Sequence, residues 1–574
     1  MKKLLVIAMA SLLLTGCNIS SSSNGNAKEN SNSGNTTQTT QTSTNSNTQT
    51  TQTTQTTQTT SVTLKSISVT GGTRIFTVGD TFNYDGLVVT AKYSNNSTRV
   101  VTPTSVSTPN MSTTGSKTVT VKYSEGNVEK STSYSITVNK APNPKRKYTI
   151  MIYMCGSNLE SGTQTDYWGN VVSTNPDSAG MATGNIQEIL SLNGKPDDVN
   201  IIIETGGANA WKSTYGISSS KLERWHVENK QLVKDDSLTY ASMGLSSTFQ
   251  SFLEWGLTYY PADKTGVVLW NHGGAMQGCC YDEKKNDDQL TPLELKKAVG
   301  DAFTSKGRTE KLEWIGYDCC LMGVADIAYY NSSYFNYMVG AQESEPGEGW
   351  DYDGWLDDLY ANPNISTTSL LSEMCDTFVT KCRAGYEEYS AELYAYGNNS
   401  SNFQWNSYYQ AYVDDEGYTQ QAYLNAAEEY ADYNDATLAL YDLSKMEAYK
   451  TAFESLASSI KTNISSYSNC KSQVLDKTLR FGVQYDEDEN EYYLYDTYDA
   501  QSFINKLKAY KSAIDTSAYK TALDNVVIHN GFGHTYTKNG EEPIGLCVYA
   551  KNQSSNCVSS ASDAAFPTWY NYAK

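Results

Sequence analysis

The sequence predicts two folded parts, a small antiparallel β-sandwich followed by a larger α/β domain whose mostly parallel sheet carries helices on both faces. Three observations support this prediction. The chain has 574 residues, more than one ordinary domain needs. Residues 62–139 alternate apolar and polar side chains with a period of two. From Tyr148 onward, short apolar runs alternate with longer helical patterns.

The sandwich is predicted from runs such as LKSISV, LVVTAKY, KTVTVKY and SYSITV within residues 62–139. These runs are rich in β-branched residues, and turn signals (GG, VGD and NNS) separate them at intervals of about ten residues. The stretch FTVGDTFNYDGLVVTAKYSNNSTRVVT resembles the bacterial immunoglobulin-like domains of cell-surface proteins. By that resemblance the domain is a spacer or a wall-binding unit, and we assign it no chemistry. A basic linker, residues 140–147, follows.

The amino-terminal segment predicts export. Residues 1–17 contain two lysines, an apolar run and the sequence LTGC, a signal-peptide pattern too short to span a membrane. Small residues directly before a cysteine resemble the lipobox of bacterial lipoproteins. By that resemblance Cys17 becomes lipidated and the protein is an extracellular, membrane-anchored lipoprotein; an ordinary signal peptide is the alternative. Residues 18–61, nearly all Ser, Thr, Asn, Gln and Gly, predict a disordered stalk.

Composition restricts the partners of this protein. Asp and Glu total 63 against 43 Lys and Arg, a net charge of −20, which argues against nucleic-acid binding. No later segment has about 18 consecutive apolar residues, so we expect membrane contact only through the lipid anchor. We further expect a monomer. Connectivity of any disulfides cannot be read from sequence.

The elements of the larger domain follow from apolar runs of strand length and from helical periodicity between them. Strands are predicted at 148–154, 198–204, 266–270, 312–317 and 337–341. Helices are predicted around 186–192, 248–260, 291–303 and 322–330. Two further apolar runs, 436–443 and 544–550, are expected to add strands after an irregular, Tyr-rich acidic insert near 384–435.

Two of the predicted strands end in reactive side chains. VVLWNHGG ends in His272, and LEWIGYDCCLMG ends in Asp318, Cys319 and Cys320. One helical stretch separates these strands, so a right-handed crossover places them side by side or nearly so, with an imidazole near a thiol. A thiolate is the attacking species, and an imidazole generates it and protonates the leaving amine. The N–H groups of Gly273 and Cys320 are the candidate oxyanion hole.

These blocks, with YTIMIYMCGSNLES and ESEPGEGWDYDGW, resemble the clostripain family of cysteine endopeptidases. The resemblance covers most of residues 148–574 and implies a caspase-like fold. It implies that His272 is the catalytic histidine and Cys320 the nucleophile. It also implies that Asp318 lines the pocket for the substrate residue before the cleaved bond (P1) and favours Arg or Lys there. An Ala commonly stands at the position of Cys319, and the register of DxCLMG favours Cys320.

The resemblance also suggests how the protein is activated. Family members are often cleaved after a basic residue between the two motifs, which here predicts self-cleavage after Lys284 or Lys285. Some members respond to calcium, but the acidic run 485–499 lacks EF-hand spacing and is more typical of a solvated face. We therefore predict that no cofactor is required and keep calcium as an open alternative.

Each candidate residue has a structural alternative. His272 could stabilise a turn, Asp318 could bond a neighbouring loop, and Cys319 or Cys320 could pack in the core or form a disulfide. A zinc site built from His272 and the cysteine pairs is disfavoured, because adjacent cysteines lack the usual spacer between ligands. Three glutamates follow the strand predicted at 337–341: Glu343, Glu345 and Glu348. They could add negative charge to the P1 pocket, but the favoured interpretation is that they lie in a solvated loop.

Two other functions compete with the endopeptidase. The first is a catalytically inactive surface lipoprotein that only binds, to which the stalk and sandwich fit equally well. The second is a glycan-active protein, suggested by the many Tyr and Trp residues. No pair of carboxylates at the strand ends stands out as an acid/base couple, so the glycan-active alternative ranks last.

Overall fold

The computed structural model describes residues 61–165, 171–194, 197–485, 491–493, 495–534, 541–550, 558 and 560–573. These residues form two compact units that divide between Asn143 and Pro144. The predicted signal peptide, the predicted lipidation site Cys17 and the predicted stalk up to residue 60 lie outside the described residues. Within the described part, every helix is too short or too polar to cross a bilayer.

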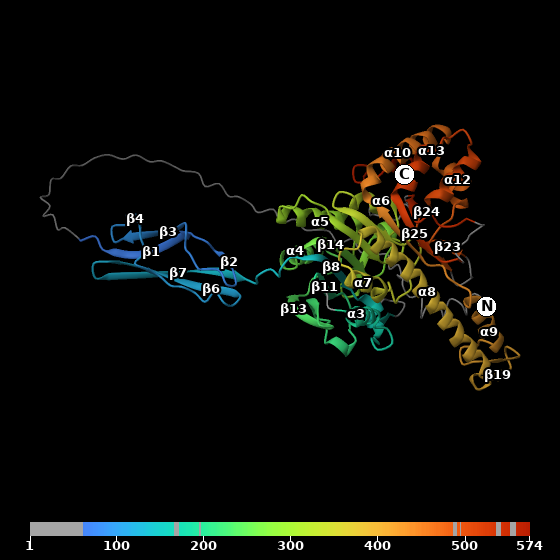
Figure 1. The fold of residues 1–574 in the computed structure, drawn as a ribbon, viewed down its shortest axis with the longest axis horizontal. Coiled ribbons are helices and arrows are strands. Elements are labelled where there is room, and N and C mark those ends of the chain that lie inside the picture. The colour runs from blue at the N-terminus through green and yellow to red at the C-terminus, as the bar shows by residue number, and fades with distance from the viewer. Residues whose placement is uncertain are drawn as a thin grey trace, which may run out of the picture. The chain divides into compact units, whose positions relative to one another are not determined.

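The smaller unit is a two-sheet sandwich, as predicted, although one of its strand pairs, β2 with β7, is parallel instead of antiparallel (Figure 1). One sheet has the order β1 (Leu64–Gly71), β3 (Leu87–Tyr93), β4 (Thr98–Val101). The other has the order β2 (Ile75–Thr77), β7 (Val128–Asn139), β6 (Gly115–Glu125), β5 (Ser105–Val106). Alternate residues such as Val89 and Ala91, and Val119 and Val121, are buried between the sheets, which is the physical basis of the period-two pattern.

The larger unit contains a nine-stranded sheet whose five central strands are parallel. Those strands are β11 (Val199–Gly206), β8 (Arg146–Cys155), β14 (Ala262–Trp270), β17 (Leu312–Asp318) and β18 (Phe335–Gly340). Antiparallel strands extend both edges: β12 (Lys221–Glu228) and β13 (Gln231–Thr239) on one, β21 (Thr437–Asp442) and β25 (Val527–Phe532) on the other. All five predicted central strands are confirmed, and the run 436–443 forms β21.

The run 544–550 behaves differently from the prediction, because it does not extend the main sheet. It forms β26 (Cys547–Tyr549), which pairs with β24 (Thr497–Asp499) as a separate two-stranded sheet. The described part of this unit contains further pairs of short strands, among them β9 (Gln164–Thr165) with β10 (Val171–Ser173), β15 (Cys279–Asp282) with β16 (Asp288–Leu290), and β22 (Val483–Tyr485) with β23 (Glu491–Tyr493).

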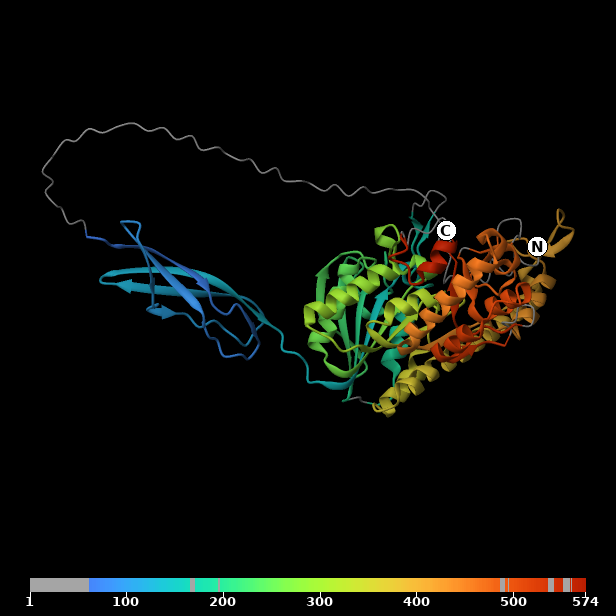
Figure 2. The same ribbon diagram turned by 90° about the horizontal axis from the view of Figure 1, so that it is seen from above.

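Helices cover both faces of the main sheet (Figures 1 and 2). One face packs against α3 (Met181–Ser191), α7 (Tyr352–Ala361) and α8 (Thr367–Asn398). The other packs against α4 (Ser246–Tyr259), α5 (Pro292–Lys306), α6 (Ala325–Asn331) and the carboxyl-terminal helices α10 (Met446–Asn463), α11 (Tyr467–Gln473), α12 (Ala500–Tyr510), α13 (Ser517–Val526) and α14 (Pro567–Ala573). Successive residues of β8 point to opposite layers, Ile150 and Ile152 to one and Met151 and Tyr153 to the other, so the whole strand is apolar.

The prediction of an irregular insert near 384–435 is wrong. Helix α8 continues to Asn398, and a hairpin of β19 (Gln404–Asn406) and β20 (Ala411–Val413) leads to α9 (Gln420–Tyr430). Figures 1 and 2 show α8 running beyond the sheet with β19 and α9 near its far end. Tyr386, Tyr389 and Leu393 lie at helical spacing and pack on the face of α9 that carries Tyr423 and Tyr430, so the tyrosines form a core.

Candidate active site

The two predicted reactive segments lie next to each other. Strands β14 and β17 are parallel neighbours in which Trp270 pairs with Asp318. His272 and Cys320 each follow this pair by two residues, and both are almost fully buried. A Cβ on Gly273 would come within 2.1 Å of the carbonyl oxygen and 2.9 Å of the nitrogen of Cys320. The two loops therefore touch through their backbones, and only glycine permits that approach.

A tight turn holds Cys320 at the end of β17. Leu321 adopts a left-handed conformation, with φ of 65°, and its N–H donates to the carbonyl of Glu343 (3.1 Å). The backbone N–H of Glu345 donates to Sγ of Cys320 at 3.2 Å. A non-glycine residue in this region of backbone space is uncommon and is found at constrained sites, which fits a turn that presents one sulfur in a set direction.

His272 has a partner that the sequence pattern did not identify. Its Nε2 lies 2.6 Å from Oδ1 of Asn158, in the short helix α2 (Ser157–Ser161) that follows β8. The same amide oxygen accepts a hydrogen bond from Oγ of Ser157 (3.0 Å). An amide oxygen cannot donate, so Nε2 carries the hydrogen and Nδ1 is left as the nitrogen that can take a proton. Asn158 stands in the quoted block YTIMIYMCGSNLES, but nothing in its spacing pointed to the histidine.

Asn271, directly before the histidine, ties the surrounding loops together. Its Nδ2 donates to the carbonyl of Cys155 at 2.6 Å, and its Oδ1 accepts from the N–H of Tyr281 at 2.6 Å. The ends of β8 and β14 and the strand β15 are thereby held in one arrangement. This buried amide satisfies two backbone groups that would otherwise lack partners.

The adjacent residues Cys319 and Cys320 differ in oxidation state. Cys319 is a free, buried thiol whose Sγ donates to the carbonyl of Leu269 (3.3 Å), and burial raises its pKa well above the ordinary value. Such a thiol stays protonated and unreactive. Cys320 is disulfide-bonded, whereas the eight other cysteines in the described part of the chain are free. The structure therefore holds the predicted nucleophile in an oxidised form.

Both cysteines line a cavity of about 10 Å³, together with Asp318 and Glu345. A space of this size holds about one water molecule and not a Lys or Arg side chain, so the cavity is closed in this structure. The carboxylate of Asp318 accepts hydrogen bonds from the N–H of Trp350 (3.2 Å) and the hydroxyl of Tyr352 (2.9 Å). Burial raises the pKa of Asp318 to about 7, although these two donors act in the opposite direction. Asp318 thus both lines the cavity and bonds a neighbouring loop.

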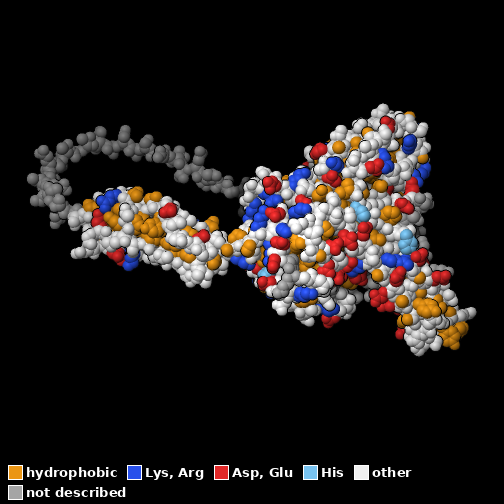
Figure 3. Space-filling view, viewed as in Figure 1, with side chains coloured by type: hydrophobic (Ala, Val, Ile, Leu, Met, Phe, Trp, Pro, Cys, Tyr) orange, Lys and Arg blue, Asp and Glu red, His pale blue; other side chains and the backbone are white. Residues whose placement is uncertain are grey.

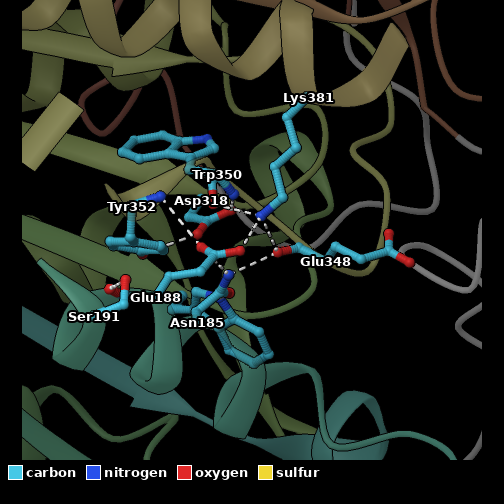
Figure 4. A network of polar contacts seen from close by, with 9 residues as sticks. Asn185, Glu188, Ser191, Asp318, Glu348, Trp350, Tyr352 and Lys381 are labelled. Atoms are coloured by element: carbon cyan, nitrogen blue, oxygen red, sulfur yellow. Dashed lines mark hydrogen bonds and ion pairs between the residues drawn. The ribbon is translucent and has the colours of Figure 1, made fainter. Parts of the chain in front are cut away.

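The loop that supplies those donors is itself clamped from two helices (Figure 4). Nζ of Lys381, on α8, contacts Oε1 of Glu188, on α3, at 2.7 Å. It also donates to the backbone carbonyls of Glu348 (3.3 Å) and Trp350 (3.0 Å). The charge of Lys381 is therefore satisfied by Glu188 and by backbone oxygens, and the carboxylate of Asp318 has no direct ion pair in this network.

The favoured solvated-loop interpretation of the three glutamates is wrong for Glu343 and Glu345, which are buried. Glu343 accepts from the backbone N–H groups of Ser344 and Gly482, which makes it a structural residue. Glu345 faces the cavity. The carboxylate of Glu348 points away from Asp318 (Figure 4).

The predicted cleavage site forms a short 3₁₀ turn (Glu283–Lys285) between β15 and β16. Asp282 caps this turn by accepting from the N–H of Lys284 at 3.0 Å, and the ammonium groups of Lys284 and Lys285 lie over the ring of Tyr240. Among the described residues, no group of three or more His, Cys, Asp and Glu side chains is placed to hold a metal ion. The zinc alternative therefore has no support in this part of the chain.

A histidine and a cysteine after neighbouring parallel strands, with a buried carboxylate beside them, are the arrangement of a cysteine peptidase built on an α/β sheet. The model of the clostripain family matches residues 170–571. The chain therefore belongs to the clostripain family. The model of the bacterial Ig-like domain (group 3) matches residues 73–138, so the smaller unit is a domain of that kind.

Individual relatives are distant in sequence. Clostripain of Hathewaya histolytica is 23% identical over 384 residues, which are 62% of this chain and 66% of that protein, so the match spans slightly less than two thirds of the relative. Two solved structures each align with 75% of this chain at a TM-score of 0.44. One is a secreted C11 cysteine protease from Bacteroides thetaiotaomicron with an irreversible peptide inhibitor (16% identity, 99% of that chain), and the other is an inactive zymogen C11 protease from Parabacteroides distasonis (14% identity, 96% of that chain).

Proposed function

We propose that this protein is an exported, lipid-anchored cysteine endopeptidase that cleaves peptide bonds after Arg or Lys. The observation that carries the proposal is the shared position of His272, Cys320 and Asp318 at the ends of two neighbouring strands. His272 takes the thiol proton of Cys320, the thiolate attacks the scissile carbonyl, and the imidazolium then protonates the leaving amine. The backbone N–H groups of Gly273 and Cys320 would stabilise the oxyanion.

Charge supports the choice of a basic P1 residue. A buried carboxylate rewards a cation and penalises an anion at the same place. Figure 3 shows acidic side chains gathered on the exposed face of the larger unit, and the whole chain carries a net charge of −20. Such a surface attracts basic substrates from solution. We further propose self-cleavage after Lys284 or Lys285, which requires the capped turn at these residues to open, and catalysis that requires no cofactor, with calcium as the alternative.

The proposal is tested with fluorogenic peptides that carry Arg, Lys, Ala or Asp at P1. We expect cleavage after Arg and Lys only, in reducing buffer and with or without a calcium chelator. The closed cavity and the oxidised Cys320 favour the alternative of an inactive binding lipoprotein for the state described here. Absence of cleavage after reduction, and after trace trypsin treatment to nick the 284–285 turn, would establish that alternative.

Activity should depend on a thiol reductant. A disulfide at Cys320 leaves no thiolate to attack a carbonyl, so we expect negligible cleavage by the air-oxidised protein and recovery on adding dithiothreitol. Iodoacetamide labelling followed by peptide mass analysis should find Cys320 modified only after reduction. Equal activity with and without reductant would show that the disulfide does not control the nucleophile.

Replacing Asn158 by alanine should slow catalysis and leave substrate binding almost unchanged. Loss of its hydrogen bond frees the imidazole to rotate and leaves the imidazolium without an acceptor at Nε2. A hydrogen bond to a charged group contributes roughly 1.5–3 kcal/mol, which corresponds to a fall in kcat of about 10- to 100-fold.

Ser157→Ala is the matched control, because Ser157 bonds the same amide oxygen but not the ring. We expect Asn158→Ala also to shift the pH profile of kcat, which a purely structural defect would not do. Unchanged kcat and an unchanged profile would remove Asn158 from the site.

A further inference from the structure

The segment that joins α8 to α9 places a group of aromatic side chains in solvent. In its hairpin of β19 and β20, Trp405 lies directly opposite Tyr412, and the centroids of the two rings are 5.4 Å apart. Trp405 is 59% exposed, and Tyr408, in the hairpin loop, is 85% exposed. We call the exposed aromatic side chains of this segment the aromatic tip: Tyr394, Tyr396, Trp405, Tyr408, Tyr409 and Tyr412. Figure 3 shows hydrophobic side chains gathered at this end of the molecule. Such a group of exposed rings marks an interaction site.

The aromatic tip stands on a folded base. Phe403 and Val413, at the two ends of the hairpin, are buried, and Phe403 belongs to the core that α8 and α9 share. Within the hairpin loop, Oδ1 of Asn406 accepts a hydrogen bond from the N–H of Tyr408 at 2.9 Å. The rings are therefore exposed because the fold presents them, and their exposure is not the result of an unpacked loop.

Charge restricts what the aromatic tip can bind. Residues 393–413 contain no Asp, Glu, Lys, Arg or His. Asp414, the next residue, is buried, and its carboxylate accepts hydrogen bonds from the N–H of Tyr418 and the hydroxyl of Tyr423. Nucleic acids and anionic membranes are held by Lys and Arg, and neither occurs between Arg383 and Lys445. A protein partner would bury its own charged groups against a patch that offers no opposite charge. An uncharged ligand fits this surface best.

The polar side chains among the rings are amides and hydroxyls. Gln404, Ser407 and Gln410 are all exposed in or beside the hairpin loop. In residues 384–435, all of which the structure describes, the large exposed apolar side chains are Tyr and Trp alone. A face that inserts into a membrane also needs aliphatic and basic side chains. Amides and hydroxyls both donate and accept hydrogen bonds, so the ligand should carry many hydroxyl groups.

We propose that the aromatic tip binds a chain of uncharged sugars. A pyranose ring presents C–H groups on its faces and hydroxyls around its rim. The negative face of an aromatic ring attracts the C–H groups, and the neighbouring amides can bond the hydroxyls. The rings of Trp405 and Tyr412 are inclined at 70°, and those of Tyr408 and Tyr409 at 88°. The tip is therefore not flat, which suits a single soluble polysaccharide chain better than the face of a crystalline one.

The aromatic tip lies far enough from the candidate active site to act independently of it. Helix α8 rises about 25 Å between Lys381, which holds the active-site loop, and its end at Asn398. Figures 1 and 2 show β19 beyond the sheet, near that end of α8. A bound polysaccharide would hold the protein in place and leave the ends of β14 and β17 open. The inference does not depend on the proposed peptidase activity.

The test measures how far the full-length protein is retarded in native gels that contain soluble β-glucan, galactomannan, starch or glycol chitin. We expect retardation by at least one of these uncharged polysaccharides. Trp405→Ala should weaken binding, as the dissociation constant from a concentration series, by about 10-fold or more, and Tyr408→Ala should act in the same direction. Tyr510→Ala is the matched control, because Tyr510 is also an exposed aromatic residue but lies on α12. Its dissociation constant should equal that of the wild type.

Each other outcome counts against the proposal. No retardation by any of the four polysaccharides would overturn it. Retardation that is unchanged in both Trp405→Ala and Tyr408→Ala, with wild-type melting temperatures, would remove the aromatic tip from the binding site. If Trp405→Ala does not fold, Tyr408→Ala decides alone, since a side chain that is 85% exposed contributes little packing. Binding of lipid vesicles or of a protein that depends on Trp405, without polysaccharide binding, would assign the tip to another class of partner. Peptide cleavage by the same variants should equal that of the wild type, so failure of the wild type to cleave bears only on the proposed function.

Discussion

Replacing Cys320 by alanine is expected to abolish peptide cleavage. The thiolate is the only nucleophile in the proposed mechanism, and removing a nucleophile of this kind lowers kcat by roughly 10⁴-fold or more. The measurement is kcat/KM for an Arg-P1 peptide with the reduced protein. The same variant should also stop self-cleavage at Lys284 or Lys285, which intact mass after incubation would show.

Cys319→Ala is the control that tests the register of the motif. Cys319 is a protonated thiol bonded to the carbonyl of Leu269, so its loss removes a packing contact and no reacting atom. We expect this variant to keep wild-type kcat/KM to within a few fold. Loss of activity in Cys319→Ala with retention in Cys320→Ala would assign the nucleophile to the other sulfur, and retention in both would reject the mechanism.

Replacing Asp318 by asparagine is expected to remove the selectivity for basic P1 residues. A buried charge opposite a substrate cation is worth about 2–5 kcal/mol, so kcat/KM for Arg and Lys peptides should fall by about 30-fold to several thousand-fold. Alkylation of Cys320 by iodoacetamide should proceed normally, because that reaction does not use the P1 pocket. Asp326→Asn is the matched control: burial also raises the pKa of Asp326 to about 7, but it lies on α6 and lines a different cavity. An equal fall in kcat/KM in both variants, or no fall in either, would show that Asp318 does not select the P1 residue.

The pH dependence of P1 selectivity in the wild type should reflect the ionisation of Asp318. Because burial raises the pKa of Asp318 to about 7, the group gains a proton and loses its charge as the pH falls through that value. We therefore expect kcat/KM for an Arg peptide, divided by that for an Ala peptide, to fall on the acid side of about pH 7. Dividing the two values removes the effect of ionisation of His272 and Cys320, because that effect is the same for both substrates. Asp318→Asn should show a flat quotient.

Much of the fold was predictable because each layer leaves a local pattern. Central strands buried on both faces are continuously apolar, and the helices between them show amphipathic spacing, so β8, β14 and β17 could be located from residues 148–317 alone. The Tyr-rich segment near 384–435 was misassigned because its tyrosines pack on one another across α8 and α9. Tyr is apolar in body and polar at its tip, so a tyrosine core is hard to distinguish from a polar surface by composition.

The candidate site was only partly readable for a related reason. His272, Asp318 and Cys320 follow predicted strands, so their meeting point could be inferred from chain topology. Asn158 lies in the short helix α2 and Glu345 in a loop, and the positions of both segments depend on packing. Their roles depend on distances of 2.6 Å from Asn158 to the imidazole and of 3.2 Å from the Glu345 N–H to the sulfur, and sequence carries no such distances.

The sequence by itself determined the two folded parts, the positions of the central strands along the chain and the identity of the residues at the ends of those strands. These follow from periodicity and from which side chains can do nucleophilic chemistry, both of which are local properties. The tertiary structure decided which sulfur accepts the N–H of Glu345, which partner orients the imidazole, and that Glu345 lines a buried cavity with Asp318 instead of lying in water. Burial, hydrogen-bond partnership and pKa are properties of neighbours brought together from distant parts of the chain, so they exist only once the sheet and its loops have packed.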